Sequence, residues 1–551
     1  MRRRAVVFGL VAAVFLSLGP APPEAQTAPG NVLVSVSSSE EQGNGDSQAP
    51  SISADGNRIA FASSATNLVP DDTNDAPDAF VRDIAGGWTK RVSVKSGGGQ
   101  TSGISVNAPV ISGNGRWVAF VSKDDTITPK GESGNQDVFL HDLRTSKTIL
   151  VSKLSSGRAR PTGDADTPSL SYSGRFISFS TNDSLMRSDH NHEQDVYVWN
   201  RVTGKMRIAS LTNYGTPADS NNDYGMLSAD GGCVAFRSFA TNLTQRYRYS
   251  GTDVFVRDLV RGGTRRGSVP NRGARGGHNS FGAGLNSNGT QLLFGSKDAL
   301  VAKHDGYTPD VYRRDLRTGR TFVVTRTSGR GKVGGNGTSI SGNGRYAAVK
   351  LVRFVNDTQR WKIVVRDMRK GVNRAAAVAL DGGSPNGPFD NPVITLRANA
   401  VAYESAATNL VVSDANDKID VFLRPTGLKT RWSPSRRPSG CGNGLRLRPR
   451  PFCFDEKADW IGSRRDEHIL GTWWSESHYA RGGNDSISAW LGRDRVCGND
   501  GRDSLDGGPG RDLLSGGRGD DELIGSGGHD VCYGGPGRDK AKGCEMTFGV
   551  P

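Results

Sequence analysis

The sequence predicts an all-β protein in two parts, a seven-bladed β-propeller followed by a C-terminal parallel β-roll. Two internal repeats carry this prediction, one of about 57 residues and one of nine, each with seven copies. Glycine is frequent, at 73 of 551 residues, while apolar alternation persists between the glycines. This composition indicates many turns joining short strands rather than disorder.

Each copy of the long repeat predicts four short antiparallel strands. The first two strands, as in residues 51–61, are joined in most copies by Asp-Gly, Asn-Gly or Ser-Gly, which tolerate the positive φ of a tight hairpin. The sixth copy begins its third strand with Lys362, whereas the other copies begin theirs with an aspartate. These aspartates are Asp78, Asp137, Asp195, Asp253, Asp310 and Asp420. A turn such as residues 143–146 then leads to the fourth strand.

A ring of blades follows from these units. A single four-stranded sheet cannot bury both of its faces, whereas blades packed in a ring cover each other. Residues 31–37 look like a fourth strand with no strands before it, and the last unit has only a weak fourth strand at 430–433. We therefore expect the N-terminal strand to complete the last blade.

The long repeats resemble the TolB-type (WD-repeat-like) propeller family over residues 31–433. The fragments SADGNRIAFASSATNLV and DAFVRDI carry the resemblance, and SAATNLVVSDANDKIDVFLR repeats it near the end. It implies a fold more than a function, because propellers host many activities. The tight hairpins belong to one face, and the long polar loops, such as residues 95–109 and 270–284, belong to the other. We expect any ligand on that long-loop face.

Beyond residue 452 the period falls to nine, with the template Gly-Gly-x-Gly-x-Asp-x-apolar-x. Residues 507–515 and 516–524 match it at every fixed position, and the register extends over 480–542. The glycines permit tight turns that bring backbone carbonyls inward, and the aspartate adds a charged oxygen. Calcium takes six to eight oxygen ligands, so these residue types at this spacing predict calcium binding. The candidate ligands are Asp485, Asp494, Asp503, Asp512, Asp521, Asp530 and Asp539.

These units resemble the hemolysin-type (RTX) calcium-binding repeats over about residues 453–545, with eroded leading units at 458–462 and 466–471. In the roll that this family forms, two units make one turn, so the resemblance implies two rows of aspartates. Asp485, Asp503, Asp521 and Asp539 would line one edge, and Asp494, Asp512 and Asp530 the other. Without a cation the rows would repel, which predicts folding coupled to calcium. Arginine at the fifth position (Arg502, Arg511 and Arg538, with Arg493 one place earlier) predicts weakened affinity.

The N-terminus predicts export. Three arginines at positions 2–4 precede an apolar run over 5–18 and small residues before position 25, which is typical of a secretory signal peptide (1–25). We expect a secreted or extracellular protein, with periplasm or cell envelope as alternatives and no membrane span. Residues 434–452, rich in Pro and Arg, predict a linker. The net charge of +14 is spread along the chain, so no nucleic-acid partner is expected.

Six cysteines fit an oxidising compartment. Cys233 stands alone in an apolar strand and is interpreted as a buried free thiol. Cys532 and Cys544 bracket the end of the repeats and could form a disulfide. Cys441 could pair with Cys453, or Cys453 with Cys497.

Function is less constrained than fold. Carboxylates at short spacing in residues 71–78 and 414–420 could encircle a cation, but Asp and Asn also make turns by bonding their own backbone. The sequence shows no catalytic motif of a hydrolase, zinc enzyme or phosphate loop. The favoured hypothesis is a non-enzymatic calcium-binding protein whose propeller recognises a protein or glycan. The alternatives are a calcium-stabilised extracellular propeller enzyme, a hydrolase or lyase, and an envelope accessory protein.

Overall fold

The computed structural model describes residues 30–550 apart from 105–108, 129–133, 154–162, 187, 214, 245–250, 272–278, 302–308, 326–332, 356–357, 429, 431, 434–439, 442–459, 464 and 474. The predicted signal peptide and most of the predicted linker lie outside these residues. Every regular element in this part of the chain is a β-strand, as the sequence predicts. The described residues contain no helix long and apolar enough to cross a membrane.

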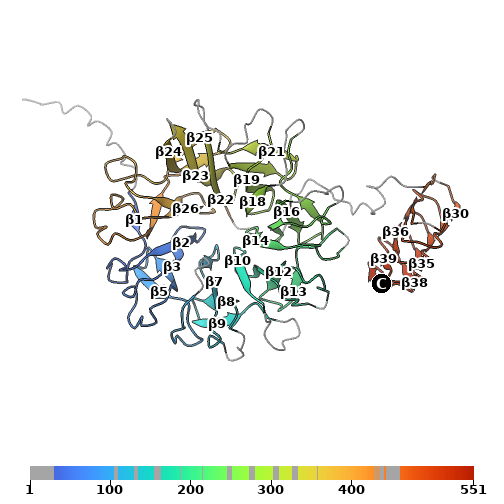
Figure 1. Ribbon diagram of the computed structural model, residues 1–551, viewed down its shortest axis with the longest axis horizontal. Helices are drawn as coiled ribbons and strands as arrows, with labels where there is room; N and C mark the ends of the chain where they lie inside the picture. Colours follow the sequence, from blue (N-terminus) through green and yellow to red (C-terminus); the bar gives the residue numbers. More distant parts are fainter. Residues whose placement is uncertain are drawn as a thin grey trace, which may run out of the picture.

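Seven four-stranded antiparallel sheets form a ring, with the first strand of each blade nearest the centre (Figure 1). Blade 1 consists of β2 (Ser47–Ile52), β3 (Arg58–Ser63), β4 (Asp78–Asp83) and β5 (Trp88–Arg91), and blade 2 of β6 (Val110–Ile111), β7 (Trp117–Ser122), β8 (Asp137–Asp142) and β9 (Lys147–Leu150). Blade 3 consists of β10 (Ala165–Leu170), β11 (Phe176–Thr181), β12 (Asp195–Asn200) and β13 (Met206–Ile208), and blade 4 of β14 (Asn222–Leu227), β15 (Cys233–Ser238), β16 (Asp253–Asp258) and β17 (Thr264–Arg266). Blade 5 consists of β18 (Ser280–Leu285), β19 (Gln291–Ser296), β20 (Asp310–Asp315) and β21 (Arg320–Val323), and blade 6 of β22 (Val333–Ile340), β23 (Tyr346–Val355), β24 (Thr358–Asp367) and β25 (Val372–Ala375).

Blade 7 joins the two ends of the propeller. It consists of β26 (Phe389–Ile394), β27 (Ala400–Ser405), β28 (Asp420–Pro425) and, as its outer strand, β1 (Val32–Leu33). Val32 pairs with Leu423 and Leu33 with Phe422, so the N-terminal strand closes the ring as expected. β1 takes the place that residues 430–433 would otherwise fill.

Aromatic pairs between the second and third strands fill the blades. Ring centroids lie 5.6–6.1 Å apart in Phe61–Phe80, Phe120–Phe139, Phe179–Tyr197, Phe236–Phe255, Phe294–Tyr312 and Tyr403–Phe422. In blade 6 the paired positions are Val349 and Val364. The twelve aromatic side chains are the largest fully buried ones among the described residues, so their burial contributes strongly to the stability of the blades.

The leading aspartate of the third strand has a structural role. In six blades it is buried and accepts a hydrogen bond from a hydroxyl two residues beyond the end of the fourth strand. The pairs are Ser93–Asp78, Ser152–Asp137, Ser210–Asp195, Ser268–Asp253, Thr325–Asp310 and Ser35–Asp420. Blade 6 has Lys362 and Ala377 at the same fifteen-residue separation, so both partners are replaced together.

The first hairpins of the seven blades are joined in a closed circle of backbone hydrogen bonds. The donor and acceptor pairs, given as N–H to carbonyl, are Ala54–Gly113, Asn114–Tyr172, Tyr172–Ala229, Asp230–Ser287, Ser287–Gly342, Gly342–Leu396 and Arg397–Ala54. Trp432 packs edge-on against Tyr172 of blade 3 and donates from Nε1 to Ser287 Oγ of blade 5 at 2.7 Å. Because it reaches hairpins of separate blades, this indole covers the axis on the hairpin face.

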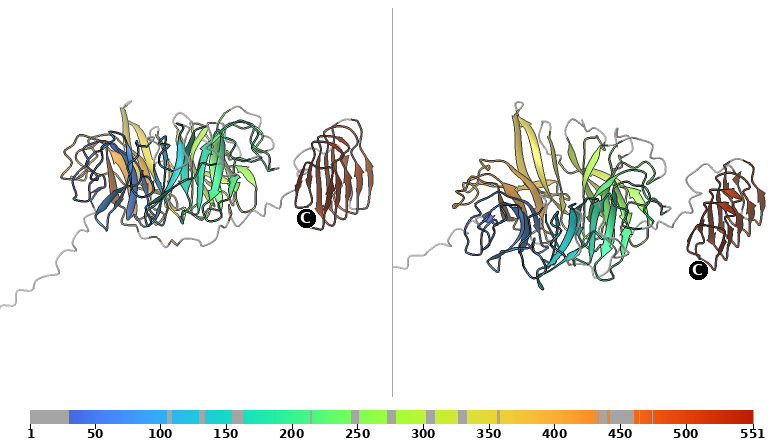
Figure 2. Two further views of the ribbon diagram at one scale, coloured as in Figure 1. Left: turned by 90° about the horizontal axis from the view of Figure 1, so that it is seen from below. Right: turned by 60° about the horizontal axis from the view of Figure 1, so that its bottom comes forward.

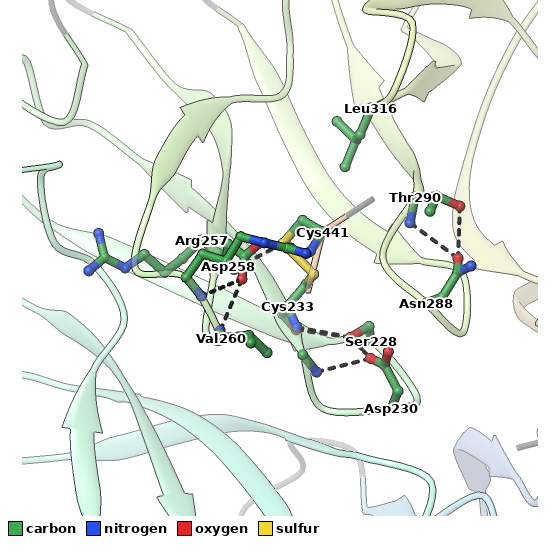
Figure 3. The surroundings of a disulfide bond; sticks show 12 residues. Ser228, Asp230, Cys233, Arg257, Asp258, Val260, Asn288, Thr290, Leu316 and Cys441 are labelled. Carbon is green, nitrogen blue, oxygen red and sulfur yellow. Dashed lines mark hydrogen bonds and ion pairs between the residues drawn. A yellow bond between two sulfur atoms is a disulfide. The ribbon is translucent and has the colours of Figure 1, made fainter. Parts of the chain in front are cut away.

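The expectation that Cys233 is a buried free thiol is wrong. It forms a disulfide with Cys441, 208 residues away, at the hairpin end of blade 4 (Figure 3). Asp258 Oδ2 accepts from the Cys441 N–H at 3.0 Å, and Arg265 donates to the Cys441 carbonyl at 2.7 Å. The local strand pattern around Cys233 is genuine, but it cannot reveal that the chain returns to blade 4 after blade 7. Cys441 is therefore unavailable to Cys453, which lies outside the described residues.

The C-terminal part is a parallel roll of two sheets, seen as a ladder of strands in Figure 2. One sheet contains β29 (Trp460–Ile461), β31 (Ser477–Tyr479), β33 (Arg495–Asp500), β36 (Leu513–Arg518), β39 (Val531–Tyr533) and β41 (Met546–Phe548). The other contains β30 (His468–Leu470), β32 (Ser486–Ser488), β34 (Ser504–Asp506), β37 (Glu522–Ile524) and β40 (Lys540–Lys542), and β35 (Pro509–Gly510) pairs with β38 (Gly527–Gly528). Ile487 pairs with Leu505, and Leu505 with Leu523. Paired residues are eighteen apart, so two nine-residue units make one turn, and the eighth-position side chains form the thin core.

Candidate calcium-binding edges of the roll

The structure brings the seven predicted aspartates together in two rows. Asp485, Asp503, Asp521 and Asp539 form the first edge, and Asp494, Asp512 and Asp530 form the second edge, with the predicted grouping. Along the first edge each aspartate N–H donates to Oδ1 of the next one, at 2.8 Å (Asp485 to Asp503), 2.9 Å (Asp503 to Asp521) and 3.0 Å (Asp521 to Asp539). The second edge repeats this at 2.9 Å (Asp494 to Asp512) and 2.8 Å (Asp512 to Asp530).

The other carboxylate oxygen, Oδ2, lacks a hydrogen-bond partner among the described residues in all seven aspartates. Each of these Oδ2 atoms is also buried. A buried carboxylate oxygen is costly unless a donor or a cation compensates it. One orphan atom per nine-residue unit, repeated along both edges, is what a row of cation sites requires.

The glycines of the template leave room for oxygen atoms and not for side chains. A Cβ at first-position Gly498 would lie 2.1 Å from Asp503 Oδ2, and one at Gly516 would lie 2.3 Å from Asp521 Oδ2. A Cβ at fourth-position Gly519, where φ is +134°, would lie 1.7 Å from the Gly501 carbonyl oxygen of the preceding turn. Backbone carbonyls and orphan carboxylate oxygens therefore share the same loops.

These oxygens fit calcium better than a transition metal. No group of three His, Cys, Asp or Glu side chains that could hold a metal occurs among the described residues. One carboxylate per unit must be supplemented by backbone carbonyls, and a hard cation with six to eight oxygen ligands accepts that combination. When bound, calcium would supply the positive charge that neutralises the two rows.

Without that charge, burial and mutual repulsion disfavour the ionised form of the aspartates in the two rows. Burial raises the pKa of Asp503 and Asp512 to about 7, and that of Asp494 and Asp521 to about 6. The backbone N–H bonds oppose this rise, whereas neighbouring carboxylates add to it. Ionising all the aspartates of a row at once is therefore unfavourable unless a cation is bound.

Three carboxylates that were not predicted from the sequence extend the rows. Glu467 and Glu476 stand at the sixth position of two earlier units, and their N–H groups donate to Asp485 Oδ1 and Asp494 Oδ1. Their own carboxylates accept from the N–H groups of Ser463 and Thr472, so they cap the start of each row. Counting back by nines from Asp485 would have found both.

The third missed residue, Glu545, ends the second edge. Its Oε2 accepts the Asp530 N–H at 2.6 Å, where a following aspartate would otherwise stand. The Cys532–Cys544 disulfide, which was predicted as possible, lies next to it in the chain. No nine-residue spacing leads to Glu545, so only the fold reveals it.

The fifth position needs one correction. Arg493 also occupies it, rather than lying one place earlier. Its N–H donates to Ser475 Oγ in the preceding turn of the second edge, just as the Arg502 N–H donates to Asn484 Oδ1 on the first. The arginine side chains at this position are exposed, so they stand outside the rows of carboxylates.

The acidic loops of the propeller hold protein donors. Arg91 Nη1 lies 2.9 Å from Asp72 Oδ1 and 3.4 Å from Asp78 Oδ2. In the other acidic loop, Gln42 Nε2 donates to Asp414 Oδ1 at 2.9 Å and to Asp420 Oδ2 at 2.8 Å. These contacts favour the turn interpretation over a cation in either loop.

The innermost strands of the propeller carry carboxylates that are mostly paired with bases. Asp223 of β14 binds Arg237 through two hydrogen bonds, and Asp390 of β26 lies 2.7 Å from Lys350 Nζ. Burial raises the pKa of Asp166 in β10, with a smaller contribution from the charge of Asp223. This arrangement resembles a polar lining more than an acid–base pair.

A family model matches the C-terminal part of the chain. Residues 479–505 and 506–541 match the family model of the RTX calcium-binding nonapeptide repeat, in four copies. No curated protein matches the chain. Among solved structures, the chain is similar to a protein described as a TolB from Agrobacterium tumefaciens (16% identity, 50% of this chain and 79% of that one, TM-score 0.31).

Two further similar structures come from peptidases. One is the β-propeller domain of the Trilobed protease from Pyrococcus furiosus (10% identity, 72% of this chain and 97% of that one, TM-score 0.43). The other is the acylaminoacyl peptidase of Pyrococcus horikoshii (11% identity, 80% and 62%, TM-score 0.41). The chain therefore carries RTX calcium-binding nonapeptide repeats in its C-terminal region, after a seven-bladed β-propeller.

Proposed function

We propose that this is a secreted, non-enzymatic calcium-binding protein whose roll folds around calcium at Asp485, Asp494, Asp503, Asp512, Asp521, Asp530 and Asp539. The observation that carries the proposal is the set of seven buried Oδ2 atoms without a hydrogen-bond partner among the described residues. Removing a cation would leave two rows of carboxylates around a core only one side chain thick, and burial of that core cannot offset the repulsion.

The propeller is proposed to recognise a protein or glycan on its long-loop face. Trp432 and the circle of hairpin bonds occupy the opposite end of the axis, which favours the loop side for binding. The paired carboxylates Asp223 and Asp390 on the innermost strands favour binding over acid–base chemistry.

Secretion is proposed from two independent features. The first is the N-terminal pattern of three arginines, an apolar run and small residues. The second is the pair of disulfides Cys233–Cys441 and Cys532–Cys544, which persist in oxidising compartments.

A calcium titration of the full-length protein, followed by far-ultraviolet circular dichroism, tests the proposal. We expect β signal to increase with calcium and to be lost again with chelator. Asp512→Ala combined with Asp521→Ala removes one carboxylate from each edge and should shift the titration to higher calcium. If the double variant titrates like wild type, the ligand assignment is wrong.

A further inference from the structure

The second edge of the roll presents large apolar side chains to solvent. Leu470 is 68% exposed, Trp473 71%, Trp490 48% and Leu491 39%. The two indole rings lie 6.1 Å apart, and the Leu491 N–H donates to the Thr472 carbonyl of the preceding turn. These four side chains, called here the tryptophan patch, therefore gather on adjacent turns.

Trp490 occupies a backbone position that disfavours it. It stands at the second template position, where its φ is +74°, and Gly508 and Gly517 fill that position in later units. A bulky residue is rare in this left-handed region, and the ring gains only partial burial in return. Arg481, Asn499 and Ser526 also have positive φ at this position, so the strain belongs to the template, and it is the exposure of the ring that leaves it available for contact outside the roll.

Exposed basic residues flank the tryptophan patch on the same edge. The fifth positions of the second edge carry Ser475, Arg493, Arg511 and His529, whereas those of the first edge mix both signs (Asp466, Asn484, Arg502, Asp520 and Arg538). The aspartates of the second edge are buried in their row. The outer surface of this edge therefore combines indoles, leucines and cations.

The kind of partner follows from that combination. A stable protein interface buries roughly 800 Å² per partner over 20–30 residues, which exceeds four side chains. The exposed Leu470 and Leu491 beside the rings favour an apolar environment, whereas a glycan would use the rings together with polar groups such as Ser475 and Arg493. Indoles favour the membrane–water interface, leucines enter the acyl boundary, and arginines pair with phosphate.

We propose that the second edge of the roll docks on an anionic lipid surface, with the tryptophan patch inserted and Arg493 and Arg511 on the headgroup phosphates. The proposal rests on the proposed calcium-coupled folding, because only a folded roll aligns these turns. Lipid docking would then require bound calcium.

The test uses full-length protein in saturating calcium, sedimented with vesicles of phosphatidylcholine alone or mixed with phosphatidylglycerol. Trp473→Ser with Trp490→Asn removes the indoles, and asparagine suits the backbone because Asn499 has φ +80° at the same template position. The matched control is Trp361→Ser, another partly exposed tryptophan, which lies in the propeller. Arg493→Gln with Arg511→Gln is matched by Arg502→Gln with Arg538→Gln on the first edge.

We expect wild type to prefer anionic vesicles. The variant Arg493→Gln with Arg511→Gln should bind these vesicles roughly tenfold more weakly. The double tryptophan variant should lose binding to a similar extent, while both controls stay within about twofold of wild type. Equal binding to both vesicle types, unchanged binding of the second-edge variants, or capture of the patch by cell-wall glycan without vesicle binding would overturn lipid docking. Circular dichroism separates the two proposals: a normal calcium response without vesicle binding refutes lipid docking alone, whereas no calcium response refutes the proposed function.

Discussion

At the scale of single residues, the repeating aspartate of the propeller shows that a recurrent charged residue need not mark a binding site. Asp195 accepts hydrogen bonds from Ser210, Asn191 and Asn222, and burial raises its pKa to about 7. The sequence predicted the position of this aspartate in six of the seven blades but not its partner, because the hydroxyl lies beyond the end of another strand. Lys362 and Ala377, changed together in blade 6, were the clue within the sequence.

The raised pKa of Asp195 predicts a stability that falls as pH rises. The unfolded chain releases this proton near pH 3.9 and the folded chain near 7, so the favourable contribution is full below 3.9 and is lost through pH 7. The free energy of unfolding of wild type, minus that of Asp195→Asn, should fall by at most about 4 kcal/mol between pH 4 and 8. Urea denaturation at several pH values measures it.

Asp142 supplies a control of opposite sign. Its hydrogen bonds with Arg116 lower its pKa to about 2, so its contribution is present above pH 3.9 and is lost as pH falls toward 2. Asp142→Asn should therefore destabilise the protein most at neutral pH. A difference for Asp195→Asn that does not change with pH would contradict the burial argument.

At the scale of elements, both repeats predict their strands because each unit repeats its own local chemistry. The hairpin turns, the apolar alternation and the nine-residue glycine loops all agree with the final fold. The aspartate rows were predicted because stacking follows from the period once two units make a turn. Glu467, Glu476 and Glu545 were missed because glutamate departs from the template in the first two, and the chain leaves the register in the third.

The hydroxyl–aspartate pair should matter only where both members are present. Ser93 Oγ donates to Asp78 Oδ1 at 2.5 Å and accepts from the Ala79 N–H at 3.0 Å. Ser93→Ala should cost about 1–3 kcal/mol by leaving buried groups without partners. Ala377→Ser, at the equivalent place in blade 6, restores no such pair and should bring no comparable gain. Chemical denaturation compares the two, and a neutral Ser93→Ala would contradict the role assigned to the pair.

The glycine loops predict a sharp difference between two neighbouring substitutions. Gly519→Ala places a Cβ 1.7 Å from the Gly501 carbonyl oxygen at φ +134°, so the turn cannot form as built. Gly527→Ala meets nothing within 4 Å and is the matched control. The first should abolish most of the calcium-induced circular dichroism change, and the second should preserve it. Equal responses would show that the loops do not stack in this way.

At the scale of the whole molecule, the sequence predicted the ring, its closure by the N-terminal strand and the roll, but not the path between blade 7 and Cys441. Closure could be predicted because the N-terminal end of the repeats has one strand to spare and the last unit lacks a clear fourth strand. The disulfide joins residues 208 apart without any repeat to relate them. The tryptophan patch was also missed, since exposure depends on the folded turns.

The Cys233–Cys441 disulfide should stabilise the propeller. A cross-link over so long a loop restricts the unfolded chain and contributes on the order of 2–4 kcal/mol. Cys233→Ala with Cys441→Ala should lower the denaturant midpoint of the propeller transition. Cys532→Ser with Cys544→Ser should leave that transition unchanged, because this disulfide lies in the roll. An unchanged midpoint in the first variant would contradict a stabilising role.

Hydrogen–deuterium exchange of the full-length protein, with and without calcium, tests the coupling of calcium to the roll most directly. Calcium should protect amides throughout residues 468–548 and leave the propeller strands β1–β28 nearly unchanged. The aspartate N–H groups within the rows should gain the most, since each donates to the next carboxylate. Equal exchange of residues 468–548 in both conditions would contradict calcium-coupled folding.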